Sequence, residues 1–153
     1  MILLTGATGY IGSHTWVELL EAGYEVVGCD NFSNSSPSVL KRIEKITQSQ
    51  PAFVEGDVQD QAALADIFKR YKIKAVVHFA ALKAVGESVQ KPLNYYANNL
   101  NGLLSLLKVM QSFDCHHFVF SSSATVYHPD NPIPYVEGMP LGSTSPYGWT
   151  KYM

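Results

Sequence analysis

Residues 5–12 read Thr-Gly-Ala-Thr-Gly-Tyr-Ile-Gly and decide the fold, because they join a short apolar run at residues 1–5 to a stretch of helical composition. A glycine-rich turn between a strand and a helix is the phosphate-binding element of dinucleotide-binding folds. In that role Gly6 permits the tight turn, Gly9 lets the backbone approach a pyrophosphate, and Gly12 lets the helix pack closely on the strand. The phosphate charge would rest on free N–H groups at the positive end of the helix dipole. A glycine-rich turn without a ligand is the alternative, and the position between strand and helix favours the binding role.

Outward from this loop, short apolar runs alternate with longer amphipathic stretches, and no repeat interrupts them. The apolar runs predict five buried strands, at Met1–Thr5, Glu25–Asp30, Ala52–Glu55, Ala75–Ala80 and His116–Ser122. The amphipathic stretches predict helices at Tyr10–Gly23, Pro37–Gln48, Gln61–Tyr71 and Pro92–Phe113. Strands that are nearly all apolar, each followed by a helix, pair in parallel and carry helices on both faces. We therefore expect an α/β fold with a doubly wound parallel sheet.

Local signals mark where some of these elements begin and end. Asp60 is expected to cap the start of the third helix, and Gly23 to end the first. Prolines recur between residues 129 and 146 and predict a long irregular connection, of a kind that is usually functional. Residues 145–153 resemble the first turns of a further helix. The 153 residues have the size of one domain, so we expect a single dinucleotide-binding domain over residues 1–153.

The composition excludes several classes of protein. Apolar residues make up 46% of the chain and charged residues 16%, which is not the composition of a disordered chain. Eleven Lys and Arg against thirteen Asp and Glu leave a net charge of −2 without a basic block, so we expect no nucleic-acid partner. Cys29 and Cys115 lie far apart without a ligand spacing, which favours a reducing compartment and predicts neither a disulfide nor a metal site. No apolar run reaches about 18 residues and no secretory leader is visible, so we expect no membrane contact and a cytoplasmic protein.

An acidic residue closes the second predicted strand. Asp30 lies eighteen positions after Gly12, close to the roughly 20-residue offset at which a carboxylate binds the ribose of a dinucleotide. A carboxylate there accepts hydrogen bonds from both ribose hydroxyls and repels a 2′-phosphate, so the sequence predicts NAD rather than NADP. The neighbouring Asn31 could serve the same site or could be a turn residue only.

The spacing of the loop glycines, three and three, resembles that of the extended short-chain dehydrogenase/reductases. Six stretches of the chain together narrow this resemblance to the UDP-glucose 4-epimerase group. They are Thr5–Thr15 (TGATGYIGSHT), Asp30–Asn31, Phe53–Val58 (FVEGDV), His78–Pro92 (HFAALKAVGESVQKP), Ser121–Tyr127 (SSSATVY) and Ser145–Lys151 (SPYGWTK). The block at residues 78–92 is the most specific of the six. The resemblance implies a Rossmann-type NAD-binding domain.

The resemblance also implies more contacts to NAD than glycine spacing does. Spacing alone points to Gly6, Gly9, Gly12 and Asp30. The resemblance adds Tyr10, Ile11, Asn31, Phe32, Ser33, Asn34, Ser35, Asp57, Val58, Phe79, Ala80, Ala81, Lys83, Asn98, Ser123, Tyr147 and Lys151. It further implies that the substrate is contacted by Lys83, Ala84, Val85, Ser123 and Tyr147.

Tyr147 and Lys151 stand four residues apart, so a helix places both on one face. A Tyr-x-x-x-Lys spacing is usually a surface feature, but behind a cofactor domain and a serine-rich strand end it favours a catalytic pair. The resemblance implies that Tyr147 takes the proton of the sugar 4′-hydroxyl, Ser123 hydrogen-bonds the developing oxygen and Lys151 supplies the charge that tunes the base. The implied reaction is the NAD-dependent interconversion of UDP-galactose and UDP-glucose at C4 through a transient 4-keto sugar, in galactose metabolism.

Two other functions compete with this one. A nucleotide-sugar 4,6-dehydratase needs an Asp-Glu pair after the serine, and residues 124–127, Ala-Thr-Val-Tyr, contain no carboxylate. An NAD-binding fragment or sensor without turnover is the second, because members of the resembled group carry a C-terminal substrate domain that is absent here. We therefore expect a partial epimerase, incomplete at its C-terminus and inactive by itself. His128 and Trp149 depart from the epimerase pattern beside the site.

The longest predicted helix carries an apolar stripe at steps of three and four. Its members are Leu93, Tyr96, Leu100, Leu103, Leu104, Leu107 and Met110. Packing against the sheet explains most of such a stripe. The resemblance implies that this region also forms a homodimer in the complete protein, and both interpretations stay open at this point.

Overall fold

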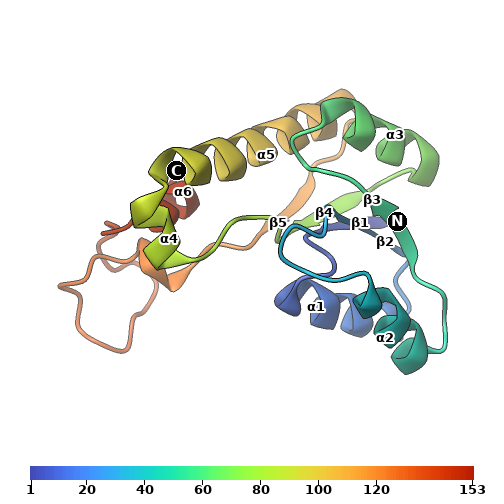
Figure 1. The fold of residues 1–153 in the computed structure, drawn as a ribbon, viewed down its shortest axis with the longest axis horizontal. Helices are drawn as coiled ribbons and strands as arrows, with labels where there is room; N and C mark the ends of the chain where they lie inside the picture. Colours follow the sequence, from blue (N-terminus) through green and yellow to red (C-terminus); the bar gives the residue numbers. More distant parts are fainter. The chain divides into compact units, whose positions relative to one another are not determined.

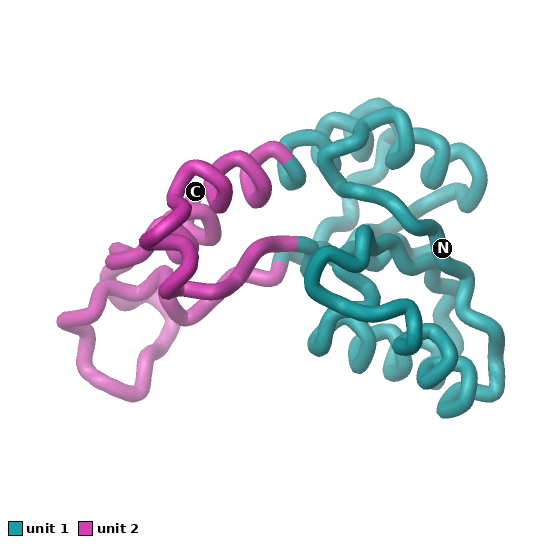
Figure 2. Tube along the Cα trace, in the orientation of Figure 1, with its two compact units in different colours: residues 1–80, 102–120 teal, residues 81–101, 121–153 magenta.

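The computed structural model describes residues 1–153, which form two compact units (Figure 2). Unit 1 comprises residues 1–80 and 102–120, and unit 2 comprises residues 81–101 and 121–153. The long helix α5 (Pro92–Ser112) contributes its first half to unit 2 and its second half to unit 1.

Unit 1 is built on a five-stranded parallel sheet (Figure 1). Its strands are β1 (Ile2–Thr5), β2 (Val26–Asp30), β3 (Ala52–Glu55), β4 (Ala75–His78) and β5 (His117–Phe120). Their order across the sheet is β3-β2-β1-β4-β5, so the order reverses between β1 and β4. This parallel order confirms the predicted doubly wound sheet. Ligands of such sheets bind beyond the carboxyl ends of the strands, at the point where the order reverses.

Helices cover both faces of this sheet because neighbouring residues of each strand point to opposite sides (Figure 1). On one face Leu4 and its strand neighbours pack under α1 (Tyr10–Glu21) and α2 (Ser38–Thr47). On the other face Leu3 packs under α3 (Gln61–Tyr71) and the second half of α5. Each fully buried Leu or Val stabilises the unit by roughly 1.5–3 kcal/mol.

The helix signals were predicted correctly. The Asp60 carboxylate caps α3 by accepting the backbone N–H groups of Ala62 and Ala63. Gly23, with a φ of +83°, follows the end of α1 in the left-handed region that glycine tolerates. The short helix α4 (Val85–Gln90) was not predicted, because its six residues are too few to show a helical period.

Burial differs from the sequence predictions in two places. Strand β5 is not fully buried: it lies at the sheet edge, and Val119 is 60% exposed because no helix covers that part of its face. The predicted stripe of α5 lies only partly in the core: Met110 is buried, Tyr96, Leu100 and Leu103 are half-buried, and Leu93, Leu104 and Leu107 are exposed. The rest of the buried face of α5 lies beside the stripe, at Tyr95, Asn99, Gly102, Ser105, Leu106 and Val109.

Unit 2 consists of α4, the first half of α5, the short 3-10 helix η1 (Ala124–Val126), helix α6 (Pro146–Tyr152) and the proline-containing connection between the last two. That connection is closed at its base, where Tyr127 forms an antiparallel bridge with Leu141 and the N–H of His128 donates to the carbonyl of Pro140 at 3.0 Å. None of the helices in either unit is long and apolar enough to cross a membrane.

Candidate active site

The glycine loop between β1 and α1 has a backbone that side chains would block. Gly6 has a φ of +67°, and a Cβ built on it would lie 2.6 Å from the backbone nitrogen of Ala80, just after β4. A Cβ on Gly12 would collide with the backbone carbonyl of Gly6. The loop therefore fits against the end of β4, and α1 fits against the loop, only because both positions are glycine.

Helix α1 begins without a capping side chain. Gly9 occupies the N-cap position, and its own N–H donates to the carbonyl of Gly6 at 3.1 Å. The first-turn N–H groups of a helix have no acceptor within the helix, and they lie at the positive end of its dipole. Tyr10 and Ile11, which open the helix, are 75% and 54% exposed. An open helix start beside the strand-order reversal is suited to a pyrophosphate, so the loop fits a dinucleotide.

Asp30 ties the end of β2 to the glycine loop. Its Oδ2 atom accepts the backbone N–H of Thr8 at 3.0 Å, and its Oδ1 atom accepts the N–H of Phe32 at 2.9 Å and the hydroxyl of Ser35 at 3.2 Å. A carboxylate offers about four acceptor positions, so this arrangement leaves about one, on Oδ2. Asp30 therefore has room for one ribose hydroxyl as it stands, and a second would require Ser35 to turn away.

Asn31 is a turn residue with a second contact. Its Oδ1 atom accepts the N–H of Ser33 at 3.0 Å, which closes a local turn, and its Nδ2 atom donates to Asp57 after β3 at 2.9 Å. Phe32 has a φ of +56° and packs its ring against Phe53, with 5.2 Å between ring centroids. The segment after β2 is thus held from both the glycine loop and β3.

In unit 2, Ser123 caps the short helix η1. Its Oγ atom accepts the backbone N–H of Thr125 at 3.2 Å and the hydroxyl of the same residue at 2.9 Å. A serine hydroxyl keeps its own proton free to donate when its lone pairs are used in this way. The Ser123 hydroxyl is therefore able to donate a hydrogen bond to a ligand oxygen at the start of η1.

Helix α6 carries Tyr147 and Lys151 one turn apart, and several hydrogen bonds anchor it. Ser145 caps its start by accepting the N–H of Gly148 at 3.1 Å. The buried Lys151 side chain donates from Nζ to the carbonyl of Ser121 at 2.8 Å, and its backbone carbonyl accepts the hydroxyl of Ser122 at 3.3 Å. These contacts hold the seven-residue helix in place within unit 2.

Burial lowers the pKa of Lys151 to about 8, because the charged ammonium is removed from water. The side chain is 8% exposed. At neutral pH the group still carries its positive charge for most of the time, so α6 presents a buried cation one turn from Tyr147.

Asn99 and Thr150 support this helix and were not predicted as site residues. The amide of Asn99 donates to the Thr150 hydroxyl at 2.9 Å, and that hydroxyl donates to the backbone carbonyl of Tyr147 at 2.7 Å. Asn99 also accepts the N–H of Leu82 at 2.8 Å and donates to its carbonyl at 3.0 Å. Asn98 donates to the Asn99 side chain at 3.0 Å. The polar Asn99 on the buried side of an otherwise apolar helix face is the signal that could have revealed it.

A hollow of about 270 Å³ lies in unit 2 beside η1. Its walls are Val85, Ala124, Thr125, Tyr127, Pro129, Tyr135, Thr144 and Ser145. The predicted substrate residue Val85 thus borders it, and the residues that follow Ser123 form part of its wall.

The predicted site residues fall into two groups. Unit 1 holds those from Gly6 to Ala80, and unit 2 holds those from Ala81 to Lys151. Within unit 1 the structure joins Asp30, Asn31, Phe32, Ser33, Ser35 and Asp57 through the contacts described above. Asn34 is exposed and Val58 is buried, and neither takes part in that network.

The sheet order and the glycine loop together define a dinucleotide-binding α/β protein. Residues 2–153 match the NAD dependent epimerase/dehydratase family, and the chain belongs to that family.

Relatives with assigned activities are similar over nearly the whole of this chain. The UDP-glucose 4-epimerase of Erwinia amylovora is 53% identical over 153 residues, which cover 99% of this chain and 45% of the relative. The structure of UDP-glucose 4-epimerase from Bifidobacterium longum in complex with NAD+ and UDP matches with a TM-score of 0.95 and 48% identity, over 98% of this chain and 45% of that one. The UDP-glucose-4-epimerase from Stenotrophomonas maltophila, with bound NAD and formylated UDP-arabinopyranose, matches with a TM-score of 0.95 and 45% identity, over 98% of this chain and 45% of that one. The chain thus spans about half the length of the relatives it matches.

Proposed function

We propose that the protein containing this chain is an NAD-dependent isomerase that interconverts UDP-galactose and UDP-glucose. It would invert C4 of the sugar through a transient 4-keto sugar and serve galactose metabolism. The observation that carries this proposal is the set Ser123, Tyr147 and Lys151 in one compact unit, with Tyr147 and Lys151 one turn apart on an anchored helix. The relatives that support it are UDP-glucose 4-epimerases at 45–53% identity.

The glycine loop and the end of β2 would hold the cofactor. The open start of α1 suits the pyrophosphate, and Asp30 suits a ribose hydroxyl. The negative charge of Asp30 disfavours a 2′-phosphate, so NAD is expected rather than NADP. When bound, NAD supplies the redox chemistry that side chains lack, by accepting a hydride from the sugar C4 and returning it.

The side chains of unit 2 would manage the proton. Tyr147 takes the proton of the 4′-hydroxyl as the C4–O bond becomes a carbonyl, and it gives the proton back when the hydride returns on the other face. Ser123 donates a hydrogen bond to the oxygen throughout. Lys151 places a positive charge one helical turn from Tyr147 and so favours negative charge on the base.

Three further properties follow from the proposal. The reaction has no net redox change, so the cofactor must stay bound throughout the catalytic cycle. UDP-sugars would lie against Lys83, Ala84 and Val85, the last of which borders the hollow beside η1. We expect a cytoplasmic protein that forms a homodimer through the exposed Leu104 and Leu107 of α5, because such a stripe is a surface that a second copy could bury.

The proposal is tested by Tyr147→Phe in the natural polypeptide that contains residues 1–153. The variant keeps the aromatic ring but loses the proton acceptor, so kcat for UDP-galactose should fall by about 1,000-fold while NAD remains bound. Tyr152→Phe, on the exposed side of the same helix, is the control and should keep full activity. A Tyr147→Phe variant with wild-type kcat would overturn the proposed function.

A further inference from the structure

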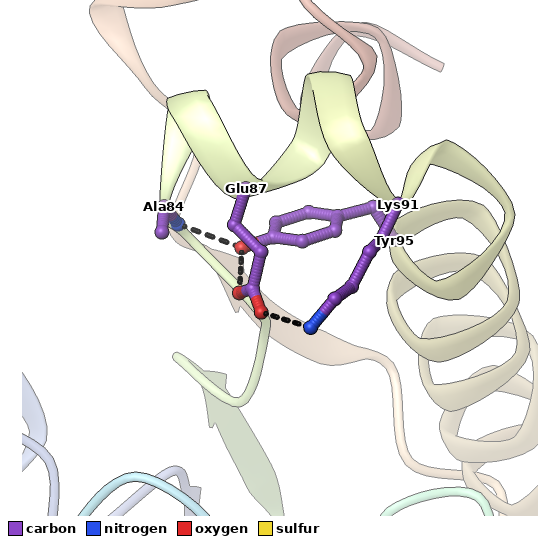
Figure 3. A network of polar contacts seen from close by, with 4 residues as sticks. All are labelled: Ala84, Glu87, Lys91 and Tyr95. Carbon is purple, nitrogen blue, oxygen red and sulfur yellow. Dashed lines mark hydrogen bonds and ion pairs between the residues drawn. The ribbon is translucent and has the colours of Figure 1, made fainter.

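Two side chains of α5 form hydrogen bonds with the backbone between β4 and α4. Tyr95 reaches from α5 to the start of α4, where its hydroxyl accepts the backbone N–H of Ala84 at 3.1 Å (Figure 3). One turn later, Asn99 binds both backbone polar groups of Leu82. The two anchors therefore lie on either side of Lys83, within unit 2.

The hydrogen bonds around Tyr95 have only one consistent direction. The Tyr95 hydroxyl has a single proton, and this proton is donated to the Oε2 atom of Glu87 at 2.9 Å (Figure 3). Its lone pair is then left to accept the N–H of Ala84. Lys91 binds the other carboxylate oxygen of Glu87 at 3.1 Å.

The charges in this cluster keep that direction fixed. The hydrogen bonds from Lys91 and Tyr95 hold the pKa of Glu87 below its usual value, so the carboxylate remains an acceptor near neutral pH. Burial and the bond to Glu87 raise the pKa of Tyr95, so its phenol keeps the proton.

Tyr95 is buried, but the segment that it binds is exposed. Tyr95 is 1% exposed, whereas Lys83, Ala84, Val85 and Glu87 are exposed. The Tyr95 hydroxyl oxygen accepts a hydrogen bond from the backbone of this exposed segment. Tyr95 therefore fixes the conformation of the segment, in addition to being buried itself.

We propose that Tyr95 is a positioning residue, which holds the backbone of Ala84 and Val85 in the conformation that receives the UDP-sugar. This inference rests on the proposed function, because that function makes Lys83–Val85 a substrate-binding segment. Glu87 acts through Tyr95 by orienting its hydroxyl. Neither residue takes part in the chemical step.

The test compares Tyr95→Phe with Tyr96→Phe in the natural polypeptide. Both variants lose one phenol oxygen, but the Tyr96 hydroxyl binds nothing in this chain. Tyr95→Phe should raise KM for UDP-galactose about tenfold, the equivalent of one hydrogen bond, with kcat and NAD affinity within about threefold of wild type. Tyr96→Phe should leave KM unchanged. Glu87→Ala, a change at an exposed position, should raise KM about threefold because the tyrosine proton loses its acceptor.

A second readout separates positioning from stability. Hydrogen exchange over residues 82–90 should accelerate in Tyr95→Phe and not in Tyr96→Phe, with other segments of unit 2 unchanged. If Tyr95→Phe instead lowers Tm and accelerates exchange throughout unit 2 while KM stays at the wild-type value, Tyr95 is a core residue and the inference is wrong.

The proposed function can fail separately. If the wild-type protein binds UDP-galactose but does not convert it, the proposed reaction is wrong, and calorimetric affinities for UDP-galactose replace KM in the same comparison. A loss of affinity confined to Tyr95→Phe and Glu87→Ala then supports the positioning role. Equal affinities in all variants, or no binding by the wild type, would overturn it.

Discussion

The two units build their parts of the candidate site in opposite ways. In unit 1 the glycine loop keeps its shape because two positions carry no side chain: Gly6 leaves room for the backbone that follows β4, and Gly12 leaves room for the loop itself. In unit 2 the helix that carries Tyr147 is held by atoms that are present, the ammonium of Lys151 and the amide of Asn99. Unit 1 should therefore fail when atoms are added, and unit 2 when polar atoms are removed.

The largest effect should come from adding one methyl group to the loop. Gly12→Ala places a Cβ on the carbonyl of Gly6, so we expect the free energy of unfolding to fall by about 3 kcal/mol. NAD affinity should fall about 100-fold because the start of α1 is displaced. Denaturant titration and calorimetry with NAD measure the two effects.

Gly86→Ala is the matched control in unit 2. A Cβ on Gly86 meets no atom within 4 Å, and Gly86 lies inside α4, so alanine should stabilise the protein by about 0.5–1 kcal/mol. Equal effects of the two substitutions would show that the glycine loop does not depend on close packing.

The next effect concerns a polar group that unit 2 buries. Lys151 has a pKa of about 8 in the folded protein, below the ordinary value of 10.5 that it regains on unfolding. Between these values the unfolded chain binds more protons, so the free energy of unfolding should rise with pH from about 8 upward. Over about 1.5 pH units the gain is up to about 2 kcal/mol.

Lys151→Met should remove this rise, because no buried ammonium is left to titrate. Chemical denaturation at pH 8 and at about pH 9.5 measures the slope in both proteins. Lys108→Met, at an exposed position of α5, should keep the wild-type slope. A wild-type protein whose stability is flat or falls over this window would contradict the buried cation.

The smallest effect tests Asp30, a side chain in unit 1 that supports the backbone through hydrogen bonds, as the side chains of unit 2 do. Asp30→Ala should lower the preference for NAD over NADP about tenfold, because the charge that repels a 2′-phosphate is gone. The same change frees Thr8 and Phe32, which weakens both cofactors alike. The ratio of the two dissociation constants therefore isolates the charge.

Glu55→Ala is the control for that ratio. Glu55 pairs with Asp30 across β2 and β3 and is exposed, so its removal changes the net charge equally. It should leave the ratio unchanged. A ratio that moves as much for Glu55 as for Asp30 would assign the preference to general charge.

The sequence predicted the sheet well because its signals are local. The Asp60 cap, the Gly23 stop and the alternation of apolar runs with amphipathic stretches each depend on residues within a few positions of one another. The glycine loop was predictable for the same reason, since its packing demands are met by residue types that are visible in a single stretch.

Burial was harder to predict, because it depends on which elements are neighbours. Val119 has the composition of a core strand but lies at a sheet edge, and Leu104 continues an apolar stripe on the exposed side of α5. Asn99 binds both Leu82 and Thr150, and Thr150 lies 51 positions after Asn99 in the sequence. No local pattern encodes such a contact. The residues that support α6 were therefore missed, although the sequence does single out Tyr147 and Lys151 as candidate site residues.

The outer edge of β5 affects how this chain behaves in solution. Its backbone N–H and C=O groups face no further strand, and the exposed Val119 lies beside them. Such an edge is a template to which another extended chain can add. Concentrated samples of residues 1–153 can thus self-associate through main-chain pairing, independently of α5. A larger particle size is then evidence for the α5 dimer only if it persists when this edge is blocked and disappears when Leu104 and Leu107 are made polar.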